Sequence, residues 1–542
     1  MSIGSASLMW KRSTTDGVPT WTTGSPRPAT RVSLVFRAGV ADETPETRGW
    51  LAASRDLVLA ARPPEGIKVR GLVKGLHTTF TVSGANDRLA EGVAWLQSRL
   101  TRPDLDLLSR VVAVRAESAR QPSLFGQLLR REVGAQGFGM AGFPEMGLQR
   151  LAPSALRWFL QVAFTTGNMA LCYDGTPPEG VGIWLPADER WSPPERLLMT
   201  RPRPAVTQVT GAEVGLLSPV PGRGVGQVFG RVLASRALRR IQVQRPGYEG
   251  VRSQTTRIDV ARGAILVAAV TDDAPAGFLL GSLEAALRDV VESGARPQEL
   301  IDIVMETHRQ VTDPNQHFAI LRRAALDDLL GLRATAPAEL LDEVKQVTAI
   351  DVAELAATVR DRHLIGIPEP EPLENPFGFP EDLPEYGRPR SGGPGAHPSV
   401  CADHPGAAVY LMPGMVHLRR NEEQGIDISS SNIVQLLAYP DGGRVVVTSD
   451  GFGHDIEPTL YENGEELVRA VDSMVPADLR FTLPQRRKVP QPVAATKDPA
   501  WKSVIAKVLP WQPAGSISPE VVAERVRQRG HDEPSRAPHR AL

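Results

Sequence analysis

The sequence has little cysteine, almost no net charge and no long apolar run. Its 542 residues include two cysteines, Cys172 and Cys401, too few for a disulfide framework and more typical of a reducing compartment. The formal net charge of −1 gives no basic field that would attract nucleic acid. A membrane span would need about 18 consecutive apolar residues, and the N-terminus lacks the apolar core of a signal peptide. We therefore expect a cytoplasmic protein that neither crosses a membrane nor binds nucleic acid.

The chain is nevertheless long and apolar enough to build several cores. Hydrophobic residues make up 42% of the sequence and charged residues 23%, which suits two to four globular domains. Arg is far commoner than Lys, and Ala, Gly and Pro are abundant. This composition favours a bacterial source with a GC-rich genome and says nothing about function.

Two long parts of the chain have a similar order of predicted elements. The first is predicted to contain a strand (77–82), four helices (87–100, 104–118, 124–133, 153–164) and a strand (168–173). The second is predicted to contain two strands (256–260, 264–271), five helices (276–292, 299–310, 317–330, 337–345, 349–360) and a strand (363–367). Any α+β protein can yield two such runs. The closing helix-to-strand segments match in order and position, however, so we favour an internal duplication.

The last third of the sequence is predicted to be a separate region. A linker rich in Pro, Gly and Glu spans 369–404 and cannot build a core. The segment 405–482 contains three predicted strands (407–411, 433–438, 444–449) and a helix (465–474). A small β-rich module capped by a helix, as in pleckstrin-homology-like domains, is one interpretation. The segment 483–542 is predicted to be an extension with a charged helix and a flexible tail.

The segment 31–60 carries a resemblance to a known family. It reads as a strand (32–36), a polar turn (38–43) and a helix (49–60). This strand, acidic loop and helix resemble the opening of the pitrilysin/insulinase-type metallopeptidases, the inverzincins, which include the mitochondrial processing peptidases. In those enzymes the helix carries H-x-x-E-H, with two zinc ligands and a general base. The corresponding positions here are Ala52, Arg55 and Asp56.

These three residues cannot make a zinc site. Two His four residues apart share one helical face and can bind one metal ion, with a third ligand from a later helix. Ala52 has no donor atom, Arg55 places a permanent cation where a base is needed, and Asp56 is a single carboxylate. Glu117 is the candidate for the third ligand, although its interval from Asp56 is shorter than in the family. The alternative is that Asp56 and Glu117 are ordinary surface carboxylates; in either case no catalytic residue and no metal ligand is expected.

The segment 235–248 resembles a second sequence motif of the family. There the resemblance implies a helix ending in Arg, a Gly-containing turn and a Tyr, with the Arg and the Tyr holding the substrate peptide. Tyr248 matches that Tyr, and the Arg position falls on Gln242, or on Arg240 if the alignment shifts. The implied substrate-binding residues are therefore Tyr248, Arg240 and Gln242. Packing at the start of a strand is the alternative role for Tyr248.

Two further segments contain residue types that occur in metal-binding and phosphate-binding sites. His397, Cys401, Asp403 and His404 are metal-ligand types, but they lie beside a Pro/Gly linker without paired spacing, so a coincidence is favoured over a metal site. The glycine-rich 222–226 lacks the Lys-Ser/Thr of a phosphate loop and is predicted to lead into a helix.

The resemblance, which covers about 25–370, implies a fold and a role. The fold class is α+β, with an N-terminal segment (1–24) and two homologous peptidase-like domains, 25–200 without the zinc motif and 201–368, each a mixed or antiparallel sheet covered by helices. The implied role is a non-catalytic subunit of a heteromeric zinc peptidase, which completes the chamber and helps to bind an extended peptide. A homologous H-x-x-E-H-bearing partner would hold the zinc, and this chain would have no activity alone. The alternative is a scaffold or assembly protein with no part in proteolysis.

Overall fold

The computed structural model describes residues 10–117, 122–191, 201–221, 224–258, 262–272, 274–369, 379–384, 386–387, 395–401, 406–486 and 488–492. The described residues up to 400 and from 406 to 491 belong to one compact unit. The charged helix predicted in the C-terminal extension lies outside the described residues. None of the described helices is both long and apolar enough to cross a membrane.

A six-stranded sheet organises the first part of the chain. Its strands are β1 (Lys11–Thr15), β2 (Val18–Thr22), β3 (Arg31–Phe36), β4 (Lys68–Val73), β5 (Thr78–Ser83) and β6 (Met169–Tyr173), in the order β1-β2-β6-β3-β5-β4. The helices of this part are α1 (Trp50–Ala60), α2 (Leu89–Thr101), α3 (Leu108–Glu117), α4 (Leu124–Val133) and α5 (Pro153–Ala163). Apolar side chains of α1, α2 and α5 form one core with every second residue of β3 (Val32, Leu34, Phe36), because alternate residues of a strand face the same side.

A five-stranded sheet organises the second part in the same way. Its strands are β7 (Ala205–Val209), β8 (Glu213–Pro221), β9 (Val251–Arg257), β10 (Arg262–Val270) and β11 (Leu364–Pro368), in the order β7-β11-β8-β10-β9. Its helices are α6 (Val225–Gln244), α7 (Ala276–Ser293), α8 (Pro297–Thr312), α9 (Pro314–Leu329), α10 (Pro337–Lys345) and α11 (Ala349–Arg360). Helix α6 begins at Val225, within the glycine-rich 222–226 that was predicted to lead into a helix.

The strand pairing shows that the two parts are built alike. β2 pairs with β6 in parallel, and β7 pairs with β11 in parallel. β3 lies antiparallel between β6 and β5, and β8 lies antiparallel between β11 and β10. β4 and β9 are the corresponding outer strands. The predicted fold class, two similar α+β domains with mixed sheets covered by helices, is confirmed.

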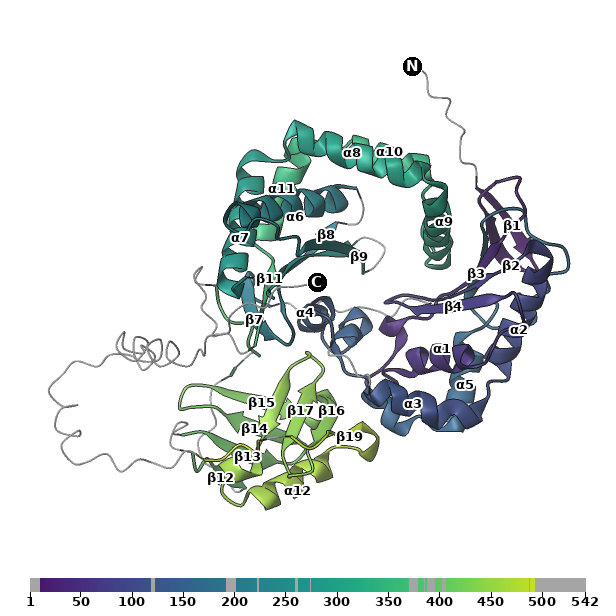
Figure 1. The fold of residues 1–542 in the computed structure, drawn as a ribbon. Helices are drawn as coiled ribbons and strands as arrows, with labels where there is room; N and C mark the ends of the chain where they lie inside the picture. The colour runs from purple at the N-terminus through teal and green to yellow at the C-terminus, as the bar shows by residue number, and fades with distance from the viewer. Residues whose placement is uncertain are drawn as a thin grey trace, which may run out of the picture. The chain divides into compact units, whose positions relative to one another are not determined.

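Each domain also lends one helix to the other (Figure 1). Helix α9 of the second domain packs on β6, β3 and β2, where Phe318 and Leu321 join Val35 and Cys172 in a small core. Helix α4 of the first domain packs on β8, β11 and β7, and its Leu128 joins the core on that face. Both sheets are therefore covered on two faces, and the two domains share buried surface.

The third region contains two four-stranded sheets and one helix. The strands are β12 (Ala396–Pro398), β13 (Ala408–Met412), β14 (Met415–Arg419) and β15 (Gly425–Ser429), then β16 (Ile433–Ala438), β17 (Arg444–Thr448), β18 (Gly453–Ile456) and β19 (Arg480–Thr482). The helix α12 (Gly464–Met474) packs into a core shared by both sheets. The expected helix cap is present, but the module does not end there, because β19 follows α12 and pairs in parallel with β16.

Candidate functional site

Helix α1 carries the three positions that correspond to the zinc motif. The helix begins after Gly49, whose φ of 102° suits glycine. Ala52 and Asp56 are four residues apart and share one face of the helix. Ala52 is 7% exposed and offers no donor atom to that face.

Asp56, which the resemblance aligns with a residue of the zinc motif, belongs to a chain of ion pairs. Arg55 Nε lies 2.7 Å from Asp56 Oδ1, and Asp56 Oδ2 lies 2.5 Å from Arg115 Nη1 on α3. Arg115 Nη2 in turn lies 2.5 Å from Glu145 Oε1. Burial alone would lower the pKa of Arg115, but its bonds to Glu145 and Asp56 outweigh burial and raise it. Helix α3 thus presents a guanidinium to Asp56.

Glu117 does not join this cluster. It is the last residue of α3 and is exposed. Because Glu117 is two residues after Arg115 on the helix, the two side chains point in directions that differ by more than a right angle. Among the described residues no three His, Cys, Asp or Glu side chains are placed to hold a metal ion. A donor-free Ala and two permanent cations beside one carboxylate do not fit zinc.

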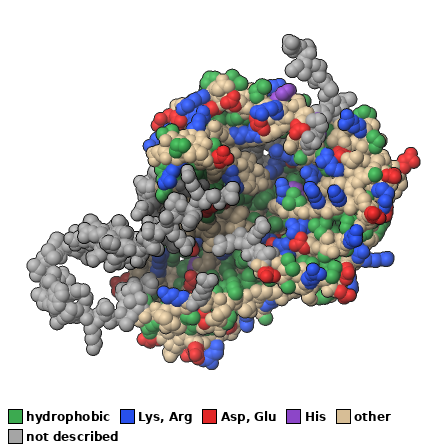
Figure 2. All heavy atoms as spheres, viewed as in Figure 1, with side chains coloured by type: hydrophobic (Ala, Val, Ile, Leu, Met, Phe, Trp, Pro, Cys, Tyr) green, Lys and Arg blue, Asp and Glu red, His purple; other side chains and the backbone are tan. Residues whose placement is uncertain are grey.

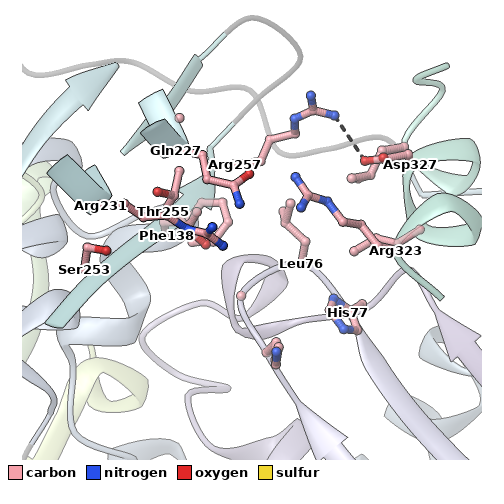
Figure 3. Close-up of a pocket in the computed structure, with 16 residues that line it drawn as sticks. Leu76, His77, Phe138, Gln227, Arg231, Ser253, Thr255, Arg257, Arg323 and Asp327 are labelled. Atoms are coloured by element: carbon pink, nitrogen blue, oxygen red, sulfur yellow. Dashed lines mark hydrogen bonds and ion pairs between the residues drawn. The ribbon is translucent and has the colours of Figure 1, made fainter. Parts of the chain in front are cut away.

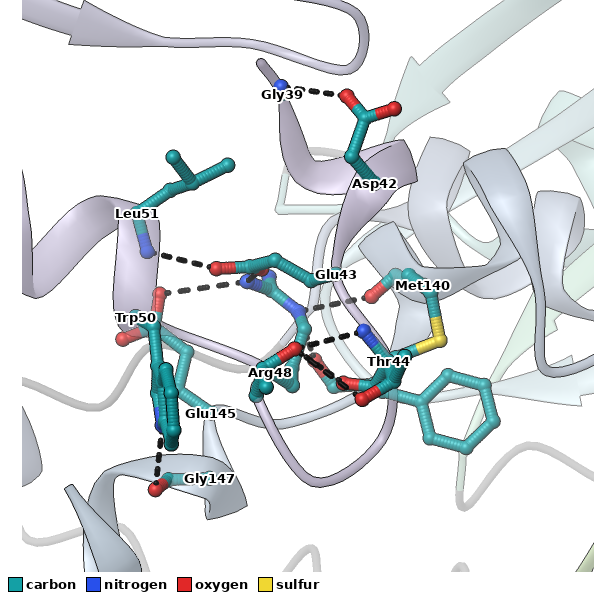
Figure 4. Close-up of polar contacts among 12 residues, drawn as sticks. Gly39, Asp42, Glu43, Thr44, Arg48, Trp50, Leu51, Met140, Glu145 and Gly147 are labelled. Carbon is teal, nitrogen blue, oxygen red and sulfur yellow. Dashed lines mark hydrogen bonds and ion pairs between the residues drawn. The ribbon is translucent and has the colours of Figure 1, made fainter. Parts of the chain in front are cut away.

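The acidic loop before α1 has a structural role that the sequence did not reveal (Figure 4). Glu43 is buried; its Oε1 accepts a hydrogen bond from Leu51 N at 2.9 Å, and its Oε2 lies 2.9 Å from Arg48 Nη1. Burial raises the pKa of Glu43, while Arg48 and backbone N–H groups oppose that rise. Arg48 Nε donates to Met140 O at 2.9 Å, and Trp50 Nε1 donates to Gly147 O at 3.0 Å. These bonds fix the start of α1 against the glycine-rich segment after α4.

The second family outline does not form a common surface. Tyr248 is 6% exposed and packs in the core of the second domain, and its hydroxyl donates to Val270 O at 2.7 Å. Gln242 Nε2 donates to Tyr248 O at 2.8 Å. Arg240 is 45% exposed on α6 and lies 3.7 Å from Asp289. These contacts support the packing role that the sequence left open for Tyr248.

The His/Cys grouping is only partly described. His397 is buried, and its Nδ1 lies 2.9 Å from Glu462 O. Cys401 is buried as well. Asp403 and His404 lie outside the described residues.

A cavity of about 440 Å³ was not foreseen from the sequence. It lies between the β4–β5 turn, α6, β9 and α9, and it is lined by residues from both domains (Figure 3). β4 and β9 are outer strands of their sheets, so each has one edge without a neighbouring strand among the described residues. No local sequence signal marks the cavity, because its lining comes from segments that are far apart in the chain.

Comparison with known proteins identifies the fold. No protein-family model and no curated protein matches the sequence. A protease from Helicobacter pylori matches with a TM-score of 0.55 at 12% identity, over 67% of this chain and 100% of that chain. A peptidase M16 inactive domain from Pseudomonas fluorescens matches with a TM-score of 0.53 at 14% identity, over 67% and 99%. A chain of Complex III2 from Candida albicans, Inz-5 bound, matches with a TM-score of 0.52 at 14% identity, over 66% and 95%.

At these identities the similarity is one of fold. These structures match about two-thirds of the chain, which agrees with the length of the two similar domains. One of the matching structures is described as an inactive domain. The chain therefore has the fold of M16 peptidase domains, the group that contains the pitrilysin/insulinase-type enzymes, and the resemblance predicted from its sequence is confirmed for the fold.

Proposed function

We propose that this chain is a non-catalytic subunit of a heteromeric M16-type zinc peptidase. A homologous partner with an intact H-x-x-E-H would hold the zinc and cut the substrate. This chain would complete the chamber and help to bind an extended peptide, in the cytoplasm of a bacterium. The observation that supports the proposal is the ion pair between Arg115 and Asp56, because the resemblance aligns Asp56 with a residue of the zinc motif.

The ion pair is part of a built structure and is more than a missing motif. Asp56, Arg115 and Glu145 are each less than a third exposed, and Arg48 and Glu43 continue the network to the start of α1. Charges paired in this way stabilise the helix contact α1–α3 without metal. A helix contact held by ion pairs suits a subunit that supports an active partner.

The unpaired strand edges support a role in peptide binding. β4 and β9 are outer strands, and an extended peptide can add to such an edge through main-chain hydrogen bonds. Exposed and partly buried residues alternate along β4, so one set of its side chains is available to select a sequence.

A scaffold role without proteolysis is the second candidate. It is favoured by the match to a chain of Complex III2, because that structure is of an assembly. The mutual exchange of α4 and α9 gives the two domains of this chain packed contacts with each other, which either role would use.

Co-expression separates the two candidates. A homologue with H-x-x-E-H, encoded beside this chain, would be produced with and without it and purified through a tag on this chain. The subunit role predicts co-purification and a chelator-sensitive peptidase activity that neither protein has alone. Co-purification of an inert pair would favour the scaffold, and failure to co-purify would contradict the subunit role.

A further inference from the structure

The cavity between the two domains has a wall of mainly basic side chains. Arg231 reaches it from α6, Arg323 from α9 and Lys74 from the β4–β5 turn, while Arg257 comes from the end of β9 (Figure 3). The only carboxylate in the described lining is Asp327, which pairs with Arg257 at 3.1 Å. The cavity wall therefore carries more positive than negative charge.

Most of that positive charge has no acidic partner. The side chains of Arg323 and Lys74 make no hydrogen bond or ion pair with the residues that the structure describes. Among the described residues, Arg231 donates hydrogen bonds to the neutral Thr307 and Gln310, and Glu306 lies near enough to oppose the lowering of its pKa by burial. This imbalance is local, since acidic and basic side chains are interspersed over most of the face seen in Figure 2 and the chain has a formal net charge of −1.

The nearby cations contribute to a lowered pKa of His77, which also lines the cavity. Its pKa is lowered to about 4, by burial first and then by Lys74, Arg322 and Arg37. Burial also lowers the pKa of Arg231. Positive groups gathered in a partly enclosed space repel one another, and an anion placed among them would relieve that repulsion.

The cavity also offers neutral hydrogen-bonding groups along a strand edge. Ser253 and Thr255 lie two residues apart on β9, share one side of the strand and line the cavity together with Gln227. β9 pairs only with β10 among the described strands. An extended chain that follows this strand would bring alternate side chains towards Arg231 and Arg323.

We propose that this cavity binds an acidic segment of an extended polypeptide, with its carboxylates held by Arg231, Arg323 and Lys74. The inference rests on the proposed peptide-binding function and adds the class of peptide to it. Guanidinium groups suit carboxylates because they offer several donors in a planar fork. A pocket of this volume falls within the range of ligand-binding pockets, about 300–1,000 Å³.

Fluorescence anisotropy with the full chain tests the proposal. The probes are a labelled peptide with alternating Asp and Ser, the same peptide with Asn for Asp, and the same peptide with Lys for Asp. The acidic peptide should bind at least about 10-fold more tightly than the Asn peptide, since hydrogen bonds to charged groups are the stronger ones. Its affinity should fall as the salt concentration rises.

Variants place the site in the cavity. Arg323→Gln should weaken binding of the acidic peptide by about 10-fold or more, whereas Arg157→Gln, the same change at an exposed position on α5, should leave it unchanged. Thr255→Trp should block binding by filling the cavity, and Gln254→Trp, at a neighbouring residue that does not line the cavity, should not. Thermal melts of all four variants check that they fold.

The outcomes are separable. Equal binding of the Asp and Asn peptides, or insensitivity to both Arg323→Gln and Thr255→Trp, would overturn the acidic specificity and leave the proposed function standing. If no peptide of any charge binds, the proposed peptide-binding function fails as well. If inorganic phosphate binds in an Arg323-dependent manner while the acidic peptide does not, the cavity holds a small anion and the inference is wrong.

Discussion

Replacement of Arg115 by Gln should destabilise the first domain measurably. Arg115 lies 2.5 Å from both Asp56 and Glu145, and its side chain is 16% exposed. Breaking a fully buried pair costs about 3–5 kcal/mol, whereas an exposed pair contributes less than about 1 kcal/mol. For this partly exposed network we expect a loss of about 2 kcal/mol, because Gln leaves two carboxylates facing each other without their shared cation.

Calorimetry of thermal unfolding measures that loss. For a domain of about 150–250 residues, 2 kcal/mol corresponds to a fall in Tm of about 4–8 °C. The matched control is Arg110→Gln on the same helix, because Arg110 is exposed and makes no ion pair or hydrogen bond with the described residues. The control should change stability by less than about 0.5 kcal/mol. If the two variants behave alike, the ion network is not what holds α1 to α3 in place of a metal.

Arg115 should also decide whether a zinc site can be built on helix α1. With Ala52→His, Arg55→Glu and Asp56→His together, we expect no stoichiometric zinc, because the guanidinium of Arg115 remains where a ligand is needed and repels the metal. Addition of Arg115→Glu removes that cation and should raise the zinc content measured by elemental analysis. One zinc per chain in the triple variant with Arg115 intact would contradict this account.

Three further predictions concern other parts of the molecule. Phe452→Leu removes the ring whose centroid lies 4.0 Å from Arg131 Cζ. It should lower the stability of α4 by about 1–2 kcal/mol and so speed hydrogen exchange there. Tyr439→Leu removes a comparable contact with Arg486 in the third region and should leave exchange in α4 unchanged. The pKa of His77 is lowered to about 4 in the folded state from 6.5, so the folded state binds fewer protons than the unfolded state. The free energy of unfolding should therefore fall by about 2.6 kcal/mol as the pH drops from 6.5 to 4, and His77→Gln should remove this loss. Tyr248→Phe should lower stability by about 1 kcal/mol, because Val270 O loses its partner, without changing peptide affinity.

Each of these has a clear contradicting result. Faster exchange in α4 on Tyr439→Leu as well would mean that the contact of Phe452 with Arg131 is not specific. An unchanged pH profile after His77→Gln would place the proton uptake elsewhere. A loss of peptide affinity in Tyr248→Phe with unaltered stability would restore the clamp role implied by the family resemblance.

Local signals in the sequence were sufficient for many helices. The predicted bounds of α4, α10 and α11 agree with the structure, and the reason is capping. Ser123 caps α4 and Gly134 ends it with a φ of 73°, while Thr348 and Asp351 form a capping box at the start of α11. Such signals lie within a few residues of the helix end, so they can be read without the fold.

Several strands and the site could not be read in this way. β4 contains Lys68, Arg70 and Gly71 and is half exposed, and β8 contains Gly215 and Pro219, so neither has the pattern of a buried strand. The loss of the zinc motif at Ala52, Arg55 and Asp56 is visible in the sequence. The ion pair between Asp56 and Arg115 depends on the contact between α1 and α3, which only the fold supplies. The exchange of α4 and α9 and the basic cavity depend on contacts between the two domains in the same way.

Under the proposed function, this chain supports catalysis by a homologous partner. The most direct test is a titration of the purified H-x-x-E-H-bearing partner with this chain, with the initial rate of peptide cleavage as the readout. The account predicts that the rate rises from near zero and reaches a plateau at one chain per partner, and that a chelator abolishes it. Full activity of the partner alone, or a rate that does not change as the chain is added, would contradict the account.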